Sequence, residues 1–270
     1  MSAPHFFIDQ VIPGKTGEYV KLILDEDVLG HMRTLRLKAG ETIALIDTPG
    51  HAWQMLLSTA PKKRSKSIEG SLTDEYMRER TVDLTLIQGI SAPDRMDQTI
   101  RQVTELGISR IIPLKSEFSN ARLDASAHER KRLRWQKIAR SAVEQSNQLY
   151  CPTIECPVNL TEALNMLEGY DLLLFFWEKA QNCPLSQAMS ECKRITPQSV
   201  PAKEQQNCAP VIKTAVFVGP EGGFSDKEAA SIMAFGARAV SLGPTILRTE
   251  TAAVVACALV LDRLGALGVS

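Results

Sequence analysis

Short runs of apolar residues separated by turn signals fill the first part of the chain. They lie at residues 5–8, 19–24, 42–47, 51–57 and 67–72. Glycine stands in the turns between them, after proline or alanine in most cases, and residues 27–37 have the pattern of one short helix. Many short strands at this spacing predict a small β-barrel domain over residues 1–75.

From residue 76 onward the hydrophobic pattern changes to strands that alternate with helices. Apolar strands are expected at 81–88, 108–114, 172–177, 214–218 and 239–242, and helices at 94–106, 124–148, 225–235 and 250–264. This alternation predicts an α/β domain with a mostly parallel sheet over residues 76–270. Residues 192–210 carry almost no bulky apolar side chain, so we expect a surface loop there.

The composition of the chain argues against several classes of protein. Lysine plus arginine and aspartate plus glutamate are equal at 31 each, which argues against a polyelectrolyte that coats nucleic acid by charge alone. The start of the chain lacks the pattern of a signal peptide, and no apolar run reaches membrane-spanning length. The six cysteines have no CxxC spacing, so we expect no metal site and reduced thiols in a cytoplasmic protein.

A glycine-rich loop follows the expected strand 214–218. It reads Gly219-Pro220-Glu221-Gly222-Gly223, and Ser225 then stands three residues before Glu228, the spacing of a capping box that opens a helix. Ligands bind at this end of the strands in open α/β sheets, although a simple tight turn is the alternative. The loop lacks G-x-G-x-x-G spacing, and the Pro-Gly-Lys-Thr run at 13–16 lacks the first glycine of a phosphate-binding loop.

A second strand-to-helix loop follows about twenty residues later. The sequence SLGPTILRTETAAVVA runs from Ser241 to Ala256, and Thr249 or Thr251 is expected to cap the following helix. Arg248 and Glu250 flank the start of that helix, where a surface salt bridge between them is the alternative to a functional role. Two such loops after successive strands favour one shared pocket.

These two motifs together resemble the RsmE family of small-subunit ribosomal RNA methyltransferases, within the SPOUT superfamily. Upstream segments follow in the family's order: DRMD at 94–97, ELGI at 105–108, PLKSE at 113–117, WQKIA at 135–139 and EQS at 144–146. LRLKAG at 35–40 is similar to the family's small RNA-binding barrel. The resemblance therefore covers nearly the whole chain.

The resemblance implies a fold, a cofactor and a reaction. It implies a PUA-like barrel, a SPOUT domain with a C-terminal trefoil knot, and a homodimer. The reaction would be methylation of uridine N3 in 16S ribosomal RNA, in the assembled small subunit, with S-adenosyl-L-methionine as donor. The implied cofactor-binding residues are Phe176, Trp177, Glu178, Val218, Gly219, Pro220, Glu221, Gly222, Gly223, Leu242, Gly243, Leu247, Arg248, Thr249 and Thr251.

Uridine N3 carries a proton, so a base or a group that stabilises the uridine anion is expected. Arg248 is the main candidate for the catalytic role, and Glu221 and Glu250 are weaker candidates for proton transfer. The candidates for RNA binding are Arg33, Arg36, Lys38, Arg95, Arg134 and Lys137, although a basic helix face can also be merely solvated. A SPOUT enzyme that acts on another RNA base and a non-catalytic RNA-binding assembly factor remain alternatives.

Overall fold

The computed structural model describes residues 3–62, 65–119, 125–180, 183–190 and 211–267. It divides into two compact units, Met1–Glu79 with Arg140–Cys151, and Arg80–Ala139 with Pro152–Ser270. The hydrophobic pattern had assigned residues 140–151 to the second domain, but in the structure they belong with the first unit. The expected loop at 192–210 lies outside the described residues, as do Cys192 and Cys208.

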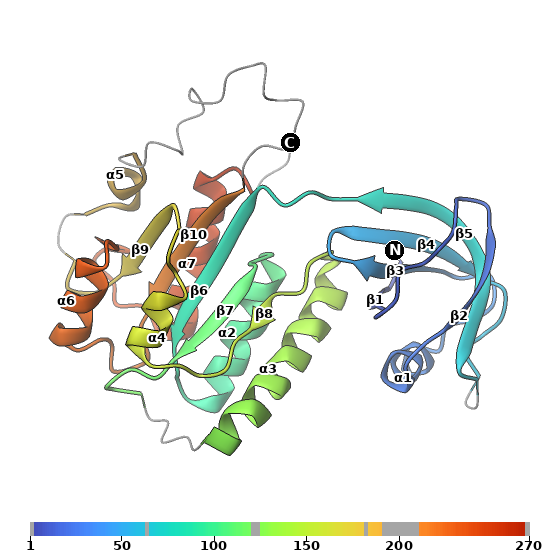
Figure 1. Cartoon of the computed structure of the whole chain (residues 1–270), viewed down its shortest axis with the longest axis horizontal. Coiled ribbons are helices and arrows are strands. Elements are labelled where there is room, and N and C mark those ends of the chain that lie inside the picture. Colours follow the sequence, from blue (N-terminus) through green and yellow to red (C-terminus); the bar gives the residue numbers. More distant parts are fainter. Residues whose placement is uncertain (1–2, 63–64, 120–124, 181–182, 191–210, 268–270) are drawn as a thin grey trace. The chain divides into compact units, whose positions relative to one another are not determined.

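Within the described residues, the first unit contains a five-stranded sheet, one complete helix and the segment Arg140–Cys151 (Figure 1). Its strand order is β1-β3-β4-β5-β2, with β1 parallel to β3 and the other pairs antiparallel. Its elements are β1 (His5–Phe7), β2 (Tyr19–Ile23), α1 (Glu26–Thr34), β3 (Thr42–Thr48), β4 (His51–Leu57) and β5 (Ser67–Met77). Strands were expected at all five of these places, and β5 is longer than its apolar pattern indicates because its second half is largely exposed.

Side chains on one face of the strands form the core of this unit, because successive residues of a strand point to opposite faces. The first half of β5 alternates between buried and partly exposed residues, as expected for a strand with one face on the core. Phe6, Met32 and Met55 are fully buried in a cluster that α1 and the strands share. Irregular pairing interrupts the β3–β4 and β4–β5 ladders, and such bulges increase local twist.

The second unit is a six-stranded, entirely parallel sheet, which confirms the predicted α/β class (Figure 1). Its strand order is β11-β9-β10-β6-β7-β8. The strands are β6 (Val82–Gly89), β7 (Arg110–Leu114), β8 (Thr153–Ile154), β9 (Leu172–Phe176), β10 (Ile212–Val218) and β11 (Arg238–Val240). The helices are α2 (Pro93–Glu105), α3 (Ala125–Ser146), α4 (Leu160–Asn165), α5 (Leu185–Ser190), α6 (Asp226–Ala234) and α7 (Thr249–Arg263). The end of α3, from Arg140 onward, belongs to the first unit.

Three short elements were not anticipated. β8 has two residues and α4 and α5 have six each, which is too short for periodicity to show. α4 does carry a local signal, because Asn159 and Glu162 form a capping box. The central strands β6 and β10 are almost continuously buried, as expected when helices cover both faces of a parallel sheet.

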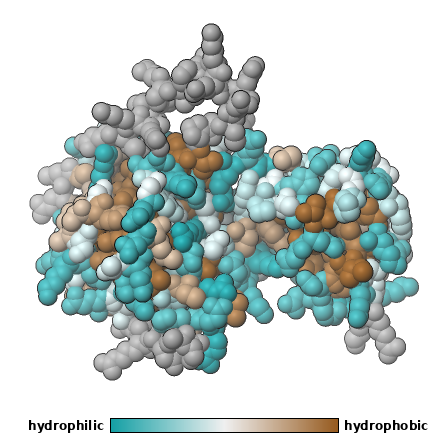
Figure 2. Space-filling model, viewed as in Figure 1, coloured by the Kyte–Doolittle hydropathy of each residue, from teal (hydrophilic) through white to brown (hydrophobic). Residues whose placement is uncertain are grey.

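Three further features concern the surface of the two units, the length of their helices and one buried thiol. Hydrophobic and hydrophilic residues are interspersed on the face of each unit that Figure 2 shows. Within the described residues, no helix combines the length and the apolar character needed to cross a membrane. Cys257 is fully buried in α7, and burial raises the pKa of its thiol to about 12, so it packs as a small hydrophobic residue.

Candidate functional site

The glycine-rich loop joins the buried strand β10 to α6. Ser225 accepts a hydrogen bond from the backbone N–H of Glu228, and the Glu228 carboxylate accepts one from the backbone N–H of Ser225. The predicted capping box is therefore confirmed, and it sets the point at which the loop ends. The loop lies at the carboxyl end of the parallel strands, where such sheets bind ligands.

The second loop joins β11 to α7, and its helix begins differently from expectation. Neither Thr249 nor Thr251 caps α7, because Arg248 is the N-cap residue and forms no side-chain cap. The Thr249 hydroxyl instead donates to the carbonyl of Gly219 at 2.5 Å. The predicted helix cap is thus wrong, and Thr249 holds the two loops together.

A cavity of about 440 Å³ lies where these loops meet the end of β9. Fourteen of the fifteen residues expected to bind the cofactor line it, and Thr251 does not, since it is exposed on α7. Six further residues complete the lining: Arg95, Ser241, Pro244, Thr245, Ile246 and Ala252. The structure therefore brings together the segments 176–178, 218–223 and 241–252 with Arg95 of α2.

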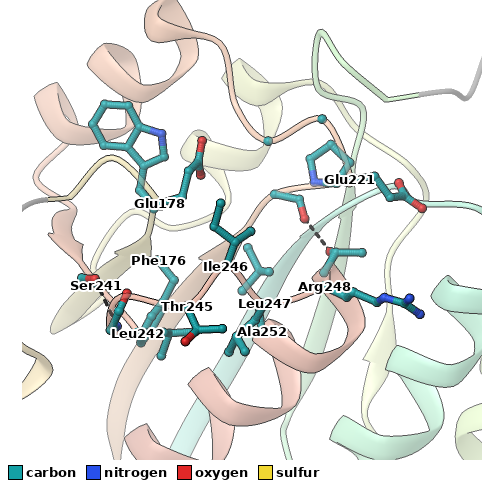
Figure 3. Close-up of a pocket in the computed structure, with 18 of the residues that line it drawn as sticks. Phe176, Glu178, Glu221, Ser241, Leu242, Thr245, Ile246, Leu247, Arg248 and Ala252 are labelled. Carbon is teal, nitrogen blue, oxygen red and sulfur yellow. Dashed lines mark hydrogen bonds between the residues drawn. The ribbon is translucent and has the colours of Figure 1, made fainter.

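The two ends of the cavity differ, because Glu221 and Arg248 form a charged end, whereas Glu178 adds a carboxylate on the side of the apolar Phe176 and Leu242 (Figure 3). Figure 3 shows Phe176 and Leu242 at one end and Glu221 and Arg248 at the other, with Ile246 between them. Ile246 is 85% exposed, so it presents an apolar side chain to the cavity. A bound molecule that fills the cavity would cover part of this apolar surface.

Gln88 at the end of β6 was not identified from the sequence. It is fully buried, and its Nε2 donates to the Thr249 hydroxyl at 2.9 Å and to the carbonyl of Gly89 at 3.0 Å. The sequence does contain an indication of its role, because Gln88 is a polar residue at the end of an apolar strand. Its hydrogen bonds connect β6 to the start of α7, which anchors both loops to the sheet.

Because glycine has no side chain, the glycine-rich loop can approach its neighbours closely. A Cβ on Gly89 would lie 2.3 Å from Pro220 Cδ, and a Cβ on Gly222 would lie 2.8 Å from Phe118 Cβ. Gly223 has a φ of 70°, which other residues rarely adopt. The loop can therefore close over the end of β6 only with glycine at these positions.

Glu221 is engaged in contacts that fix the loop. Its Oε1 accepts a hydrogen bond from the backbone N–H of Ala92 at 3.0 Å, at the start of α2, and pairs with Arg95 Nη1 at 3.2 Å. A carboxylate at a helix N-terminus is stabilised by the helix dipole. These contacts favour a positioning role for Glu221.

Arg248 and Glu250 do not form the salt bridge considered as an alternative. Within the described residues, no ion pair joins them. Arg248 is exposed at the charged end of the cavity, whereas Glu250 is buried in the first turn of α7 and does not line the cavity. Arg248 is therefore the catalytic candidate whose side chain is placed to meet a ligand.

The residues expected to bind RNA lie in different settings. In the first unit, Arg33 is engaged with Glu26 and with the carbonyl of Leu29, while Arg36 and Lys38 are exposed.

In the second unit, the three RNA-binding candidates also differ in their contacts and in their exposure. Arg95 lines the cavity beside Glu221, Arg134 pairs with Asp97, and Lys137 is exposed. No cluster of metal-ligating side chains occurs in the part of the chain that the structure describes.

Comparison with known proteins gives consistent similarities. Residues 78–261 match the model of a family described as an RNA methyltransferase domain. Two relatives are both named ribosomal RNA small subunit methyltransferase E. The protein from Synechocystis is 28% identical over 84% of this chain and 67% of its own length, and that from Bacillus subtilis is 26% identical over 85% of each.

Solved structures also resemble nearly the whole chain, and one of them carries the same name as the two relatives. It is the ribosomal RNA small subunit methyltransferase E from Neisseria gonorrhoeae, bound to S-adenosyl methionine. Its sequence is 29% identical, the TM-score is 0.77, and the match covers 97% of this chain and 98% of that chain.

Proposed function

The chain belongs to the RNA methyltransferase domain family, and from this premise we propose that it transfers a methyl group from S-adenosyl-L-methionine to N3 of a uridine in 16S ribosomal RNA. The observation that carries the proposal is the cavity that the glycine-rich loop and the loop before α7 form with the end of β9. The relative from N. gonorrhoeae, which binds S-adenosyl methionine, matches nearly the whole chain.

The cavity residues fit the chemistry of this cofactor. A volume of about 440 Å³ lies within the range of roughly 300–1,000 Å³ that small-molecule sites occupy. Apolar Phe176, Leu242 and Leu247 suit an adenine ring, and the glycines of the loop let backbone groups approach a ligand closely. The bound cofactor would supply a methyl group activated by its sulfonium.

The charged end of the cavity is where we place the uridine. Transfer would form a bond between N3 and the methyl carbon and break the carbon–sulfur bond, and the N3 proton would pass to water. Arg248 is exposed there and lines the cavity, so its guanidinium can hold a uracil oxygen and stabilise the anion as the proton leaves. Glu221 and Ala92 keep Arg95 and the loop in place beside it.

Further features of the family belong to the same proposal. We propose a homodimer that works in the cytoplasm on the assembled small subunit, with a PUA-like barrel as its first unit. We also propose a trefoil knot at the C-terminal end. Its support is the path of the chain, which runs from the edge strand β11 to α7, where α7 contacts the inner strands β6 and β10.

The direct test is methylation of assembled small subunits, naked 16S ribosomal RNA and transfer RNA, followed by primer extension. A methyl group on N3 blocks the pairing edge, so we expect polymerase to stop at one uridine in the assembled subunits. Calorimetry with S-adenosyl-L-methionine is the companion measurement. Cofactor binding with a stop at another base would overturn the uridine assignment, and no cofactor binding would overturn the enzymatic function.

A further inference from the structure

A second cavity, of about 410 Å³, lies entirely within the first unit. It is separate from the cofactor cavity and includes none of the residues expected to bind RNA. Its lining consists of Ala3, His5, Gln54, Tyr76, Met77, Arg78, Asn147 and Leu149.

Strand register places three of the lining residues, His5, Gln54 and Tyr76, on one face of the sheet. His5 of β1 pairs with Ala44 of β3, and Ala44 pairs with Gln54 of β4, so the three side chains stand in one row on the same face of the sheet. In the next row, Tyr76 of β5 pairs with Ala52 of β4. Ala44 and Ala52 are fully buried and do not line the cavity, and Asp74 of β5, which pairs with Gln54, stands in the same row as His5.

The floor of this cavity is polar and uncharged. His5 is only 7% exposed, and its Nδ1 lies 2.9 Å from the carbonyl of Ala3, an acceptor, so Nδ1 carries the proton. Nε2 is then an acceptor, 3.4 Å from the Tyr76 hydroxyl. Burial lowers the pKa of His5 despite the hydrogen bond to Ala3, and burial raises the pKa of Tyr76.

The rim of the cavity is cationic and rich in amides. Arg78 is exposed at the rim and has no ion pair within the described residues. Gln54 is half-buried, and Asn147 is held with a φ of 55°. No carboxylate lines the cavity, although Asp74 lies beside Tyr76, where its Oδ1 accepts the backbone N–H of Glu75.

We propose that this cavity binds one nucleotide of a single-stranded RNA. Arg78 would hold the phosphate, the Tyr76 ring would contact the base, and the amide of Gln54 would hydrogen-bond to the edge of the base. Aromatic rings and amides are the groups that read unstacked RNA bases, and a guanidinium suits a phosphate. The proposal rests on the proposed function in that the ligand is RNA.

The test measures the affinity of the full-length protein for a fluorescent oligouridylate by anisotropy. Arg78→Ala and Gln54→Ala are suitable variants because both side chains are at least partly exposed. We expect each to weaken RNA binding by about tenfold, as for the loss of one good base or phosphate contact. Lys15→Ala removes one exposed charge from the same unit, outside the cavity, and should change the affinity much less.

Two further measurements make the result decisive. Ultraviolet crosslinking of the same RNA should label a peptide that contains Tyr76, and competition should be stronger with uridine monophosphate than with inorganic phosphate. Equal affinities in the wild type and both cavity variants would overturn the proposal, as would a crosslink confined to other peptides. Competition by inorganic phosphate alone would show an anion site that does not recognise a nucleotide.

The outcomes separate this proposal from the proposed function. The binding assay needs neither the cofactor nor methyl transfer, so it can fail in an enzyme that binds S-adenosyl-L-methionine normally. Calorimetry with the cofactor should give the same affinity for Arg78→Ala, Gln54→Ala and the wild type.

Discussion

Thr249 shows how a single hydroxyl organises the cofactor cavity. It donates to the carbonyl of Gly219 in one loop and accepts from buried Gln88 at the end of β6. A buried polar group that loses its partner costs free energy, because water cannot replace the missing bond. The two loops and the sheet are therefore coupled through one side chain.

Thr249→Val keeps the shape of the side chain and removes these two hydrogen bonds. We expect the free energy of unfolding to fall by about 1–3 kcal/mol and the affinity for S-adenosyl-L-methionine to weaken. Denaturant unfolding and calorimetry measure the two effects. Thr251→Val is the matched control on the same helix, since Thr251 is exposed and outside the cavity. Equal effects in both variants would contradict the coupling.

Substitution of Arg248 tests its assignment as the catalytic residue. We expect Arg248→Ala to lower the rate of methyl transfer on the order of a hundredfold, because the uridine anion loses a positioned cation. Cofactor affinity should be retained, since the side chain is exposed at the charged end of the cavity. Arg248→Lys keeps the charge without the planar fork and should recover part of the rate. Unchanged turnover in Arg248→Ala would remove it from the mechanism.

His51 makes the first unit sensitive to pH. Burial disfavours its charged form, but hydrogen bonds to Asp47 and Glu75 outweigh burial and raise its pKa above 6.5. Because the folded-state pKa is the higher one, the stabilisation is fully present below pH 6.5 and is lost as the pH rises through the raised value.

Thermal unfolding across this pH window should therefore show a fall in the stability of the first unit. Relative to the wild type, His51→Gln should lack the fall that His51 causes, because glutamine does not titrate, whereas the opposite contribution of His5, whose pKa burial lowers, is present in both proteins. A nuclear magnetic resonance titration of the His51 ring gives the pKa directly, and a value at or below 6.5 would contradict the prediction.

At the scale of elements, the end of β6 and the glycine-rich loop are packed against each other. Gly89 ends the strand, and Pro220 of the loop lies directly over it. The hydrophobic pattern predicted the strand and the loop separately. It could not show that they touch, because strand order in a parallel sheet is independent of order along the chain.

Gly89→Ala tests this contact. The added Cβ would lie 2.3 Å from Pro220 Cδ and 2.4 Å from Pro220 N, so the loop must move. A displacement of this size in a positioned site is expected to lower kcat/KM roughly a hundredfold. Gly30→Ala is the control, because its Cβ meets no atom within 4 Å and it lies in α1. That change should raise stability by about 1 kcal/mol without affecting turnover.

At the scale of the whole molecule, the two units have separate cores and separate cavities. The cofactor cavity belongs to the second unit, which also contains both loops and α7. A ligand stabilises the structure that binds it, so its effect should be unequally distributed between the units.

Hydrogen exchange with and without S-adenosyl-L-methionine measures this distribution. At a cofactor concentration of about 100 times Kd, amides of the second unit whose exchange requires unfolding of that unit should gain about 2.7 kcal/mol of protection. Amides of β1 to β5 should change much less. Equal protection in both units would show instead that they unfold together.

The sequence by itself determined the local features of this protein. Periodicity placed both sheets, and the glycine-rich loops with the Ser225–Glu228 capping box were legible because each depends on neighbours a few residues away. Tertiary structure alone decided the partners. Gln88 bonds to Thr249 across 161 residues and Glu221 to Ala92 across 129, and the His5 cavity needs three strands in register. Such contacts depend on how strands are ordered in space, which local periodicity does not encode.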